Sequence, residues 1–310
     1  MSEQRIAVMG SFVTDLAFRT GTLPAWGRTV FGSDFRLGPG GKGSNQAVAA
    51  ARLGAKVTFI SKLGRDAFAE IARRTWAEEG IDARHVAEAG ARGTGAAAII
   101  VNEATGDNAI VVVPGAGLEL TTAEVDRARG AIASASVFLT QLETPLEAVR
   151  HGLALARSLE VPTILNPAPA VPLPADVYPL CDCLTPNESE AATLTGSPVA
   201  TVADAERAAE TLLRRGARAV IVTLGANGAL VRTASIRRHV PACDAGPVVE
   251  TTGAGDAFNG GLAVALAEGL DIVAAARFGC AVAGISVTRH GTAPAMPHRA
   301  EVEALLRRIG

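Results

Sequence analysis

Aromatic residues and lysines are scarce in this 310-residue sequence. Phenylalanine, tryptophan and tyrosine together make up 4% of the chain, and lysine occurs only at positions 42, 56 and 62. With 29 basic and 31 acidic residues, the net charge of −2 indicates neither a basic surface for nucleic acid nor a charged tail. Hydrophobic residues reach 48%, which excludes a disordered chain and predicts a core of small aliphatic side chains.

Long hydrophobic runs and targeting signals are also missing. The longest uncharged stretch near the C-terminal end, Ala257 to Ala267, is too short to cross a bilayer. The first residues lack the basic and apolar segments of a signal peptide, so we expect a cytoplasmic protein. Four cysteines have no zinc-binding spacing and are expected to be free thiols there. Membrane proteins and secreted disulfide scaffolds are therefore disfavoured.

Short β-branched segments alternate with longer segments rich in alanine, leucine and arginine. The predicted strands are 5–9, 56–61, 137–142, 162–165, 183–185 and 219–224. The predicted helices are 44–53, 67–79, 122–134, 145–159, 188–194 and 203–215, followed by 255–268, 272–288 and 299–309. This order predicts an α/β fold, with a doubly wound, mostly parallel sheet and helices on both faces.

Two regions break this alternation. Apolar runs at 96–101 and 109–113 predict a hairpin, and residues 13–36 lack a helical period and carry turn signals at Pro24 and Gly27. Together they predict a small antiparallel sheet that covers a cleft as a lid. We expect one domain over residues 1–310, with the lid formed by about 13–36 and 95–114.

Polar side chains follow several of the predicted strands. Asp15 comes after the first strand, Glu143 and Asn166 directly follow two others, and Asn187 and Glu190 follow a fourth. Ligands of open α/β sheets bind at the carboxyl ends of the strands. The sequence therefore predicts a site for a polyhydroxylated or phosphorylated ligand at this edge.

A first glycine-rich segment spans residues 37–46. Its glycine spacing resembles a dinucleotide fingerprint, but it does not end the first strand, Pro39 interrupts it, and no acidic residue follows at the required distance. The spacing of a phosphate-binding loop of the Walker type is absent as well. Either the segment is a tight turn before a helix, or its backbone approaches a ligand with Lys42, Asn45 and Gln46 projecting from it.

A second glycine-rich segment spans residues 250–261. The backbone N–H groups of Gly253, Ala254 and Gly255 would converge at a helix N-terminus, which favours anions. Asp256 stands beside them. Alone it could be an ordinary helix cap, but next to an anion-binding nest it fits the proton acceptor of a phosphoryl transfer.

The whole chain resembles the ribokinase-like carbohydrate kinases, and within that family the ribokinases and 2-deoxyribokinases most of all. The resemblance rests on five segments in the family's order: 40–54, 166–170, 185–190, 223–228 and 251–258. It implies that Asp256 is the catalytic base and that Gly253, Ala254 and Gly255 form the anion hole.

The resemblance also implies the binding residues. The positions that hold the sugar are Val13, Asp15, Gly41, Lys42, Asn45, Glu143 and Asp256. The nucleotide side comprises Asn187, Thr223, Gly225 and Gly228, and Glu190 lies near Mg²⁺, through phosphates or water. Positions matching a monovalent cation site are Glu250, Thr252, Ser286, Arg289 and Gly291.

Three positions depart from the family pattern. Val13 replaces the asparagine of ribokinases near the sugar's 2-position, where 2-deoxyribokinases also have an apolar residue. Glu250 replaces an aspartate that binds the activating cation, and Ala295 replaces a serine-like ligand. Potassium therefore remains a candidate activator with a weakened site.

The resemblance implies an ATP- and Mg²⁺-dependent transferase that phosphorylates the 5-hydroxyl of a pentose, such as D-ribose or 2-deoxy-D-ribose. It also implies a homodimer that pairs through the lid. The alternatives are a kinase for another sugar, a sugar acid or a nucleoside, and a catalytically silent sugar- or nucleotide-binding protein. Residues 166–170 and Glu143 favour the ribokinase branch, and the intact Asp256 with its nest argues against a silent protein.

Overall fold

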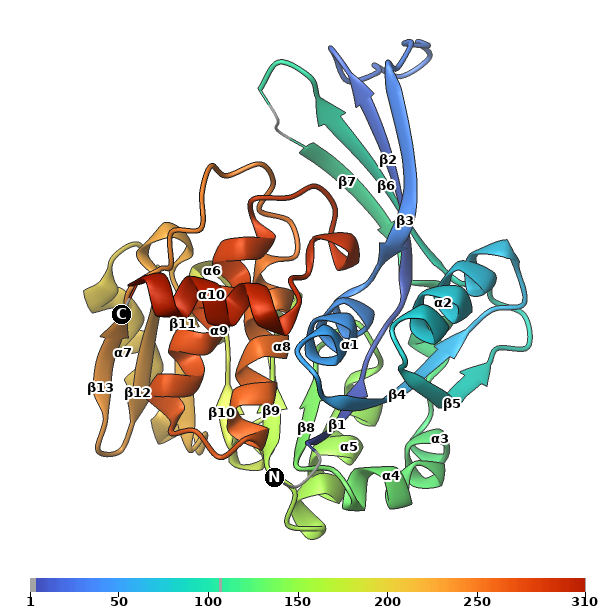
Figure 1. Ribbon diagram of the computed structural model, residues 1–310. Helices are drawn as coiled ribbons and strands as arrows, with labels where there is room; N and C mark the ends of the chain where they lie inside the picture. The colour runs from blue at the N-terminus through green and yellow to red at the C-terminus, as the bar shows by residue number, and fades with distance from the viewer. Residues whose placement is uncertain (1–3, 106–107, 310) are drawn as a thin grey trace.

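A nine-stranded sheet runs through the centre of the molecule (Figure 1). The computed structural model describes residues 4–105 and 108–309. Across the sheet the strands are β13 (Arg237–Val240), β12 (Ala229–Thr233), β11 (Ala219–Thr223), β10 (Cys183–Leu184), β9 (Thr163–Leu165), β8 (Val137–Thr140), β1 (Arg5–Met9), β4 (Lys56–Leu63) and β5 (Asp82–Glu88). Neighbours from β11 to β5 pair in parallel, and β12 and β13 are antiparallel.

All six strands predicted from the sequence occur in this sheet, which confirms its mostly parallel character. The sequence did not predict β5, β12 and β13. β5 and β13 are the two edge strands, and they carry charged or partly exposed side chains in place of an apolar run. Edge strands are often polar because charges discourage pairing with other chains.

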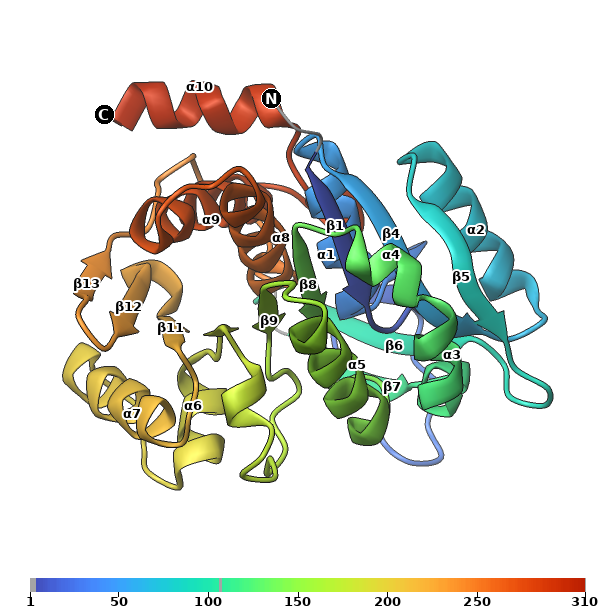
Figure 2. The same ribbon diagram turned by 90° about the horizontal axis from the view of Figure 1, so that it is seen from below.

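Helices cover both faces of the sheet (Figure 2). One face packs against α1 (Lys42–Arg52), α2 (Ala67–Glu78), α8 (Ala254–Ala267) and α9 (Ile272–Ser286), over which α10 (Arg299–Ile309) lies. The other face packs against α3 (Thr122–Arg127), α4 (Arg129–Ala133), α5 (Leu146–Ser158), α6 (Glu188–Thr195) and α7 (Val202–Arg214). The helix predicted over 122–134 is divided at Ala128 into α3 and α4.

A separate four-stranded sheet projects from this body (Figure 1). Its order is β3 (Asp34–Gly40), β2 (Val13–Thr20), β6 (Gly95–Asn102) and β7 (Asn108–Val113). The prediction of a fully antiparallel sheet was wrong, because the two central strands, β2 and β6, pair in parallel. β3 also continues past residue 36, so the first glycine-rich segment begins inside a strand.

The carboxyl ends of the parallel strands lie next to the N-termini of α1 and α8. α1 follows β3 directly, and α8 packs along α1, so two segments far apart in sequence lie side by side. Most of the predicted site residues lie at these carboxyl ends or at the start of these two helices. Among the described residues, no helix is both long enough and apolar enough to span a membrane.

Candidate active site

Asp256 lies in the first turn of α8 and is 5% exposed. Its two carboxylate oxygens are held from α1: Asn45 Nδ2 donates to Oδ2 at 2.9 Å, and Gln46 Nε2 donates to Oδ1 at 2.9 Å. The helix-cap interpretation of Asp256 is wrong, because Gly253 is the N-cap residue of α8. The carboxylate therefore faces α1 rather than its own backbone.

The start of α8 leaves room for an anion. Gly253 has a φ of 83°, a conformation that favours glycine. Apart from its chain neighbours and the backbone of its own helix, a Cβ placed on Gly255 would meet none of the described atoms within 4 Å, so there is open space beside this residue. First-turn N–H groups have no acceptor within the helix, although that of Ala254 donates to Thr251 O at 3.1 Å.

Glu143 and the start of α1 form the next part of the site. Glu143 Oε2 accepts from the backbone N–H of Lys42 at 2.9 Å and from the hydroxyl of Ser11. Gly41 has a φ of 86°, and a Cβ there would lie 2.6 Å from the backbone nitrogen of Val13. Only glycine thus lets α1 begin against the segment that joins β1 to β2.

Asp15 extends the site toward the small sheet. It lies on β2, and Thr292 Oγ1 is 3.1 Å from its Oδ2. Burial raises the pKa of Asp15 to about 6; the Thr292 hydrogen bond opposes this shift, and the charges of Glu143, Asp256 and Glu250 add to it. A cavity of about 240 Å³ opens beside it, between the small sheet and residues 290–294.

The charged side chains of the site shift one another's pKa values. Burial raises the pKa of Asp256, against the opposing effects of Lys42, Asn45 and Gln46. Burial lowers the pKa of Lys42, but the charges of Asp256, Glu143 and Glu190 outweigh it, so the net shift is upward. Lys42 therefore stays protonated as the counter-charge to these carboxylates.

Several buried polar atoms have no hydrogen-bond partner within the part of the chain that the structure describes. One of them is Asn45 Oδ1, the acceptor on the side chain that donates to Asp256. Buried acceptors are rarely left unpaired. A ligand hydroxyl at this point would satisfy the Asn45 carbonyl.

The predicted nucleotide residues lie at the ends of β10 and β11. Asn187 caps α6 and exchanges hydrogen bonds with Glu190: the side chain of each accepts from the backbone N–H of the other, both at 2.8 Å. Asn187 also forms an isolated parallel bridge with Thr223. Gly228 has a φ of 83°, and a Cβ there would lie 2.5 Å from the backbone nitrogen of Ala242.

The positions expected to bind a monovalent cation lie before α8 and at or after the end of α9, in segments joined by a hydrogen bond from Glu250 N–H to the Val287 carbonyl at 3.1 Å. Glu250 Oε2 accepts from the N–H of Gly291 at 3.0 Å and lies 3.6 Å from His290 Nδ1. The backbone carbonyl of Ser286 accepts from Arg289 N–H at 3.2 Å, and the Arg289 side chain pairs with Glu301. Thr252 lies just before the start of α8, and Ala295 is buried.

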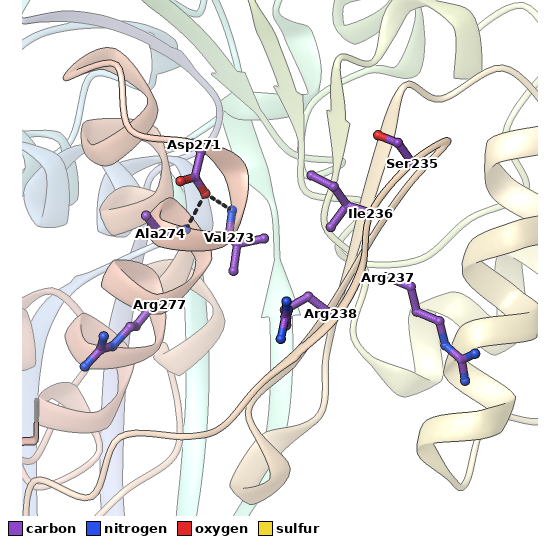
Figure 3. Close-up of a pocket in the computed structure, with 8 residues that line it drawn as sticks. All are labelled: Ser235, Ile236, Arg237, Arg238, Asp271, Val273, Ala274 and Arg277. Atoms are coloured by element: carbon purple, nitrogen blue, oxygen red, sulfur yellow. Dashed lines mark hydrogen bonds between the residues drawn. The ribbon is translucent and has the colours of Figure 1, made fainter.

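A wider cavity of about 660 Å³ lies between the β12–β13 turn and the start of α9 (Figure 3). It is outside the site, because this turn lies at the amino end of β11, whereas the site lies at the carboxyl ends of the strands. The Asp271 carboxylate accepts from the N–H groups of Val273 and Ala274, and Arg237 pairs with Glu206. Arginines on β13 are a typical means of protecting an edge strand.

Sequence reasoning missed three contributors to this site. Ser11 and Thr292 were not singled out, and Gln46 was noted without a role. Ser11 follows the first predicted strand, a position that could have drawn attention to it. Nothing local marks Thr292, whose partner Asp15 is 277 positions away in the chain.

Comparison with known proteins adds an independent finding. Residues 3–299 match the profile of a family described as pfkB family carbohydrate kinase. A ribokinase of Haemophilus influenzae is 40% identical over 296 residues, which cover 96% of each chain. A deoxyribokinase of Salmonella typhi is 38% identical over 293 residues, which cover 94% of this chain and 95% of the deoxyribokinase.

Solved structures agree with the observed fold. The ribokinase of Arabidopsis thaliana, complexed with ribose and ATP, superposes with a TM-score of 0.91 at 29% identity and covers 99% of both chains. The ribokinase of Thermotoga maritima gives a TM-score of 0.88 at 34% identity, over 98% of this chain and 99% of its own. The predicted ribokinase-like α/β fold is thus confirmed.

Proposed function

The chain belongs to the pfkB family of carbohydrate kinases, and we propose that it transfers the γ-phosphoryl group of ATP to the 5-hydroxyl of a pentose. D-ribose and 2-deoxy-D-ribose are the candidate sugars, in keeping with the names of its ribokinase and deoxyribokinase relatives. The observation that carries this proposal is the buried Asp256, held by two amides of α1 at the open N-terminus of α8.

Asp256 would act as the general base. It accepts the proton of the primary hydroxyl while that oxygen bonds to the γ-phosphorus and the bond from phosphorus to the bridging oxygen of ADP breaks. The N–H groups at the start of α8, around Gly253, Ala254 and Gly255, would stabilise the charge on the moving phosphoryl group. Lys42 adds a positive charge nearby.

The sugar would lie between Asp256 and Asp15. Gly41, Lys42, Asn45 and Glu143 surround this space, and Asn45 Oδ1 offers an unpaired acceptor. Val13 is 4% exposed, and its side chain has no polar atom to pair with a hydroxyl. A sugar without a 2-hydroxyl avoids leaving a buried group unpaired there, so we expect 2-deoxy-D-ribose to be used at least as well as ribose.

ATP would lie along the ends of β10 and β11, beside Asn187, Thr223, Gly225 and Gly228. The residues fit Mg²⁺ bound chiefly to phosphates and water: Glu190 supplies a buried carboxylate, and within residues 4–105 and 108–309 no cluster of three acidic, histidine or cysteine side chains forms a metal site. When bound, Mg²⁺ neutralises phosphate charge.

The residues fit a monovalent cation less well. The Glu250 carboxylate already accepts from Gly291 N–H and lies beside His290, and Ala295 offers no side-chain oxygen. Backbone carbonyls would supply most of the ligands. We therefore expect a potassium effect that is present but reduced.

The small sheet would act as the lid and as the dimer interface. Asp15 and Ala17 lie on the face of β2 toward the cavity, whereas Phe18 alternates to the opposite face. On that outer face the ring centroids of Phe18 and Phe35 are 4.9 Å apart, with the rings tilted by 37°, and the two residues stay 40% and 52% exposed. Val111 of β7, on the same face, is 69% exposed. Because soluble chains seldom leave such a patch uncovered, a second copy is the expected partner.

A coupled assay of ADP release, run over pentoses, hexoses, sugar acids and nucleosides, tests the proposed function. Turnover of a pentose above all other classes is the expected result. No ADP release with any sugar, despite measurable sugar binding, would favour the silent binding protein. A cytoplasmic location suits ATP as substrate and the four free cysteines, all of them buried.

A further inference from the structure

The side-chain amide of Gln46 lies at the centre of a buried hydrogen-bond network around Asp256. Its Nε2 donates to Asp256 Oδ1 at 2.9 Å and to Asn166 Oδ1 at 3.1 Å, while its Oε1 accepts from Gln141 Nε2 at 2.6 Å. Gln46 and Gln141 are both 0% exposed. With both N–H groups and the carbonyl engaged, the amide of Gln46 has a single orientation.

From Asn166 the network returns to α8 by a second route. Asn166 Nδ2 donates to the backbone carbonyl of Thr185 at 3.0 Å, and the Thr185 hydroxyl donates to Asn259 Oδ1 at 2.6 Å. Asn259 Nδ2 then donates to the carbonyl of Gly255 at 2.8 Å. Both routes therefore end in the first turn of α8, one on Asp256 and one on the residue before it.

A close approach of two helices makes these contacts short. A Cβ added at Gly260 of α8 would lie 2.5 Å from the Cβ of Ala49 and 2.9 Å from the carbonyl oxygen of Gln46, both on α1. α1 and α8 can thus pack backbone to backbone at this level. The amides of Asn45 and Gln46 then reach the carboxylate directly.

We propose that Gln46 is the positioning residue of the catalytic base, and that Gln141 and Asn166 hold it in place. The proposal rests on the function proposed above. Asn45 and Gln46 each occupy one lone pair of the Asp256 carboxylate, so each oxygen keeps a second lone pair for the sugar hydroxyl. Gln46 acts on the reaction only through the direction and ionisation of Asp256.

The network gives a role to two side chains that the proposed function does not otherwise use. Asn166 opens the segment 166–170, and Thr185 opens the segment 185–190. Neither side chain is bonded to Asp256. Asn166 joins the carboxyl end of β9 to that of β10, and the Thr185 hydroxyl joins the end of β10 to Asn259 of α8. They anchor the helix that carries the base to the sheet.

Variants of a purely structural network and variants of a network that positions the base should differ in their kinetics. Loss of a structural bond lowers thermal stability alone. Loss of the Gln46 donor also removes a group that favours the ionised form of Asp256, so the pKa of Asp256 rises further and the acid limb of the kcat profile moves to higher pH. The charged groups that face Asp256 are Lys42 on α1, Glu143 after β8, Asp15 on β2 and Glu190 on α6.

Two variants of Gln46 and two controls test the proposal. Gln46→Met keeps the length of the side chain without the amide, and we expect kcat to fall about 10- to 100-fold, with the sugar KM within about threefold and the acid limb raised by about one pH unit. Gln46→Glu nearly keeps the shape of the side chain, but its charge repels the Asp256 carboxylate. The acid limb of its kcat–pH profile should therefore move to higher pH at least as far as that of Gln46→Met.

The controls distinguish the loss of a bond in the Gln46 network from the loss of any other buried hydrogen bond. Gln141→Met removes only the bond that orients Gln46, and it should shift kcat in the same direction by a smaller factor. Thr163→Val removes a buried hydroxyl at the start of β9 that bonds Leu180 and Asp182. It should lower the melting temperature and leave the pH profile unchanged.

Each outcome decides one question. If wild type releases no ADP with any pentose, the proposed function is wrong, and the role of Gln46 falls with it. If wild type is active and both Gln46 variants keep its kcat and its acid limb, only the positioning role is overturned. Should Gln46→Met fail to fold, the pH profile of Gln46→Glu decides in its place.

Discussion

The hydroxyl of Thr292 lies 3.1 Å from Asp15 Oδ2 and 3.1 Å from the backbone carbonyl oxygen of Pro39. A hydroxyl has one proton, so it donates to only one of these acceptors at a time. When Asp15 is ionised, the charged carboxylate is the stronger acceptor. When Asp15 is protonated, it can donate to Thr292, which then donates to Pro39.

The first prediction concerns pH. Burial raises the pKa of Asp15 to about 6, and a protonated Asp15 loses acceptor capacity for sugar hydroxyls. The kcat/KM for the sugar should therefore be constant above pH 7 and fall about tenfold per pH unit well below 6. Thr292→Val removes a bond that lowers this pKa, so the fall should begin at higher pH. Profiles of kcat/KM from pH 5 to 8.5 measure this, and an Asp15→Asn variant with the same acid limb would refute the assignment.

The second prediction concerns the base. Asp256→Asn cannot accept the hydroxyl proton, and kcat should fall by about 10² to 10⁴. ATP binding should change little, because Asn187 and Thr223 lie on other elements. Steady-state kinetics with an equilibrium ATP titration checks both parts. Turnover near that of wild type would show that Asp256 is not the base.

The third prediction concerns the choice of sugar. Val13→Asn supplies a partner for a 2-hydroxyl, whose unpaired burial costs about 1–3 kcal/mol. The ratio of kcat/KM for ribose to that for 2-deoxyribose should rise roughly tenfold. Val13→Ile is the matched control, since it fills the position without a polar atom. If Asn leaves the ratio unmoved, Val13 is a packing residue and specificity is determined elsewhere.

The fourth prediction concerns potassium. At fixed ionic strength, exchange of a large organic cation for K⁺ should raise kcat by less than about tenfold, because Glu250 is engaged with Gly291 and His290. A titration of activity against K⁺ measures the effect. A completely flat response would show that the site is lost.

The fifth prediction concerns assembly. Phe18→Lys places a charge in the apolar outer face of the small sheet, where the rings of Phe18 and Phe35 are in contact. Wild type should sediment as a dimer and the variant as a monomer. Arg84→Lys, on the exposed face of β5, is the control and should sediment as wild type does. A monomeric wild type would rule out this interface.

Local sequence patterns were sufficient for the elements that are periodic and well buried. The strand at 5–9 and the helix at 299–309 were predicted to the residue, because an apolar run and an apolar stripe are visible without knowledge of the fold. The glycines at 41 and 253 were also informative, since each has a positive φ at the start of a helix of the site.

Only the tertiary structure decided the pairings. The parallel register of β2 with β6 depends on where two distant segments meet, which alternation within either strand does not encode. The same holds for Ser11 with Glu143, Gln46 with Asp256, and Thr292 with Asp15, which are 132, 210 and 277 positions apart. Which residues of a helix or strand are buried can be predicted from the local pattern of apolar residues. The hydrogen-bond partner of a buried polar side chain depends instead on how α1, α8 and the small sheet pack around the carboxyl ends of the strands.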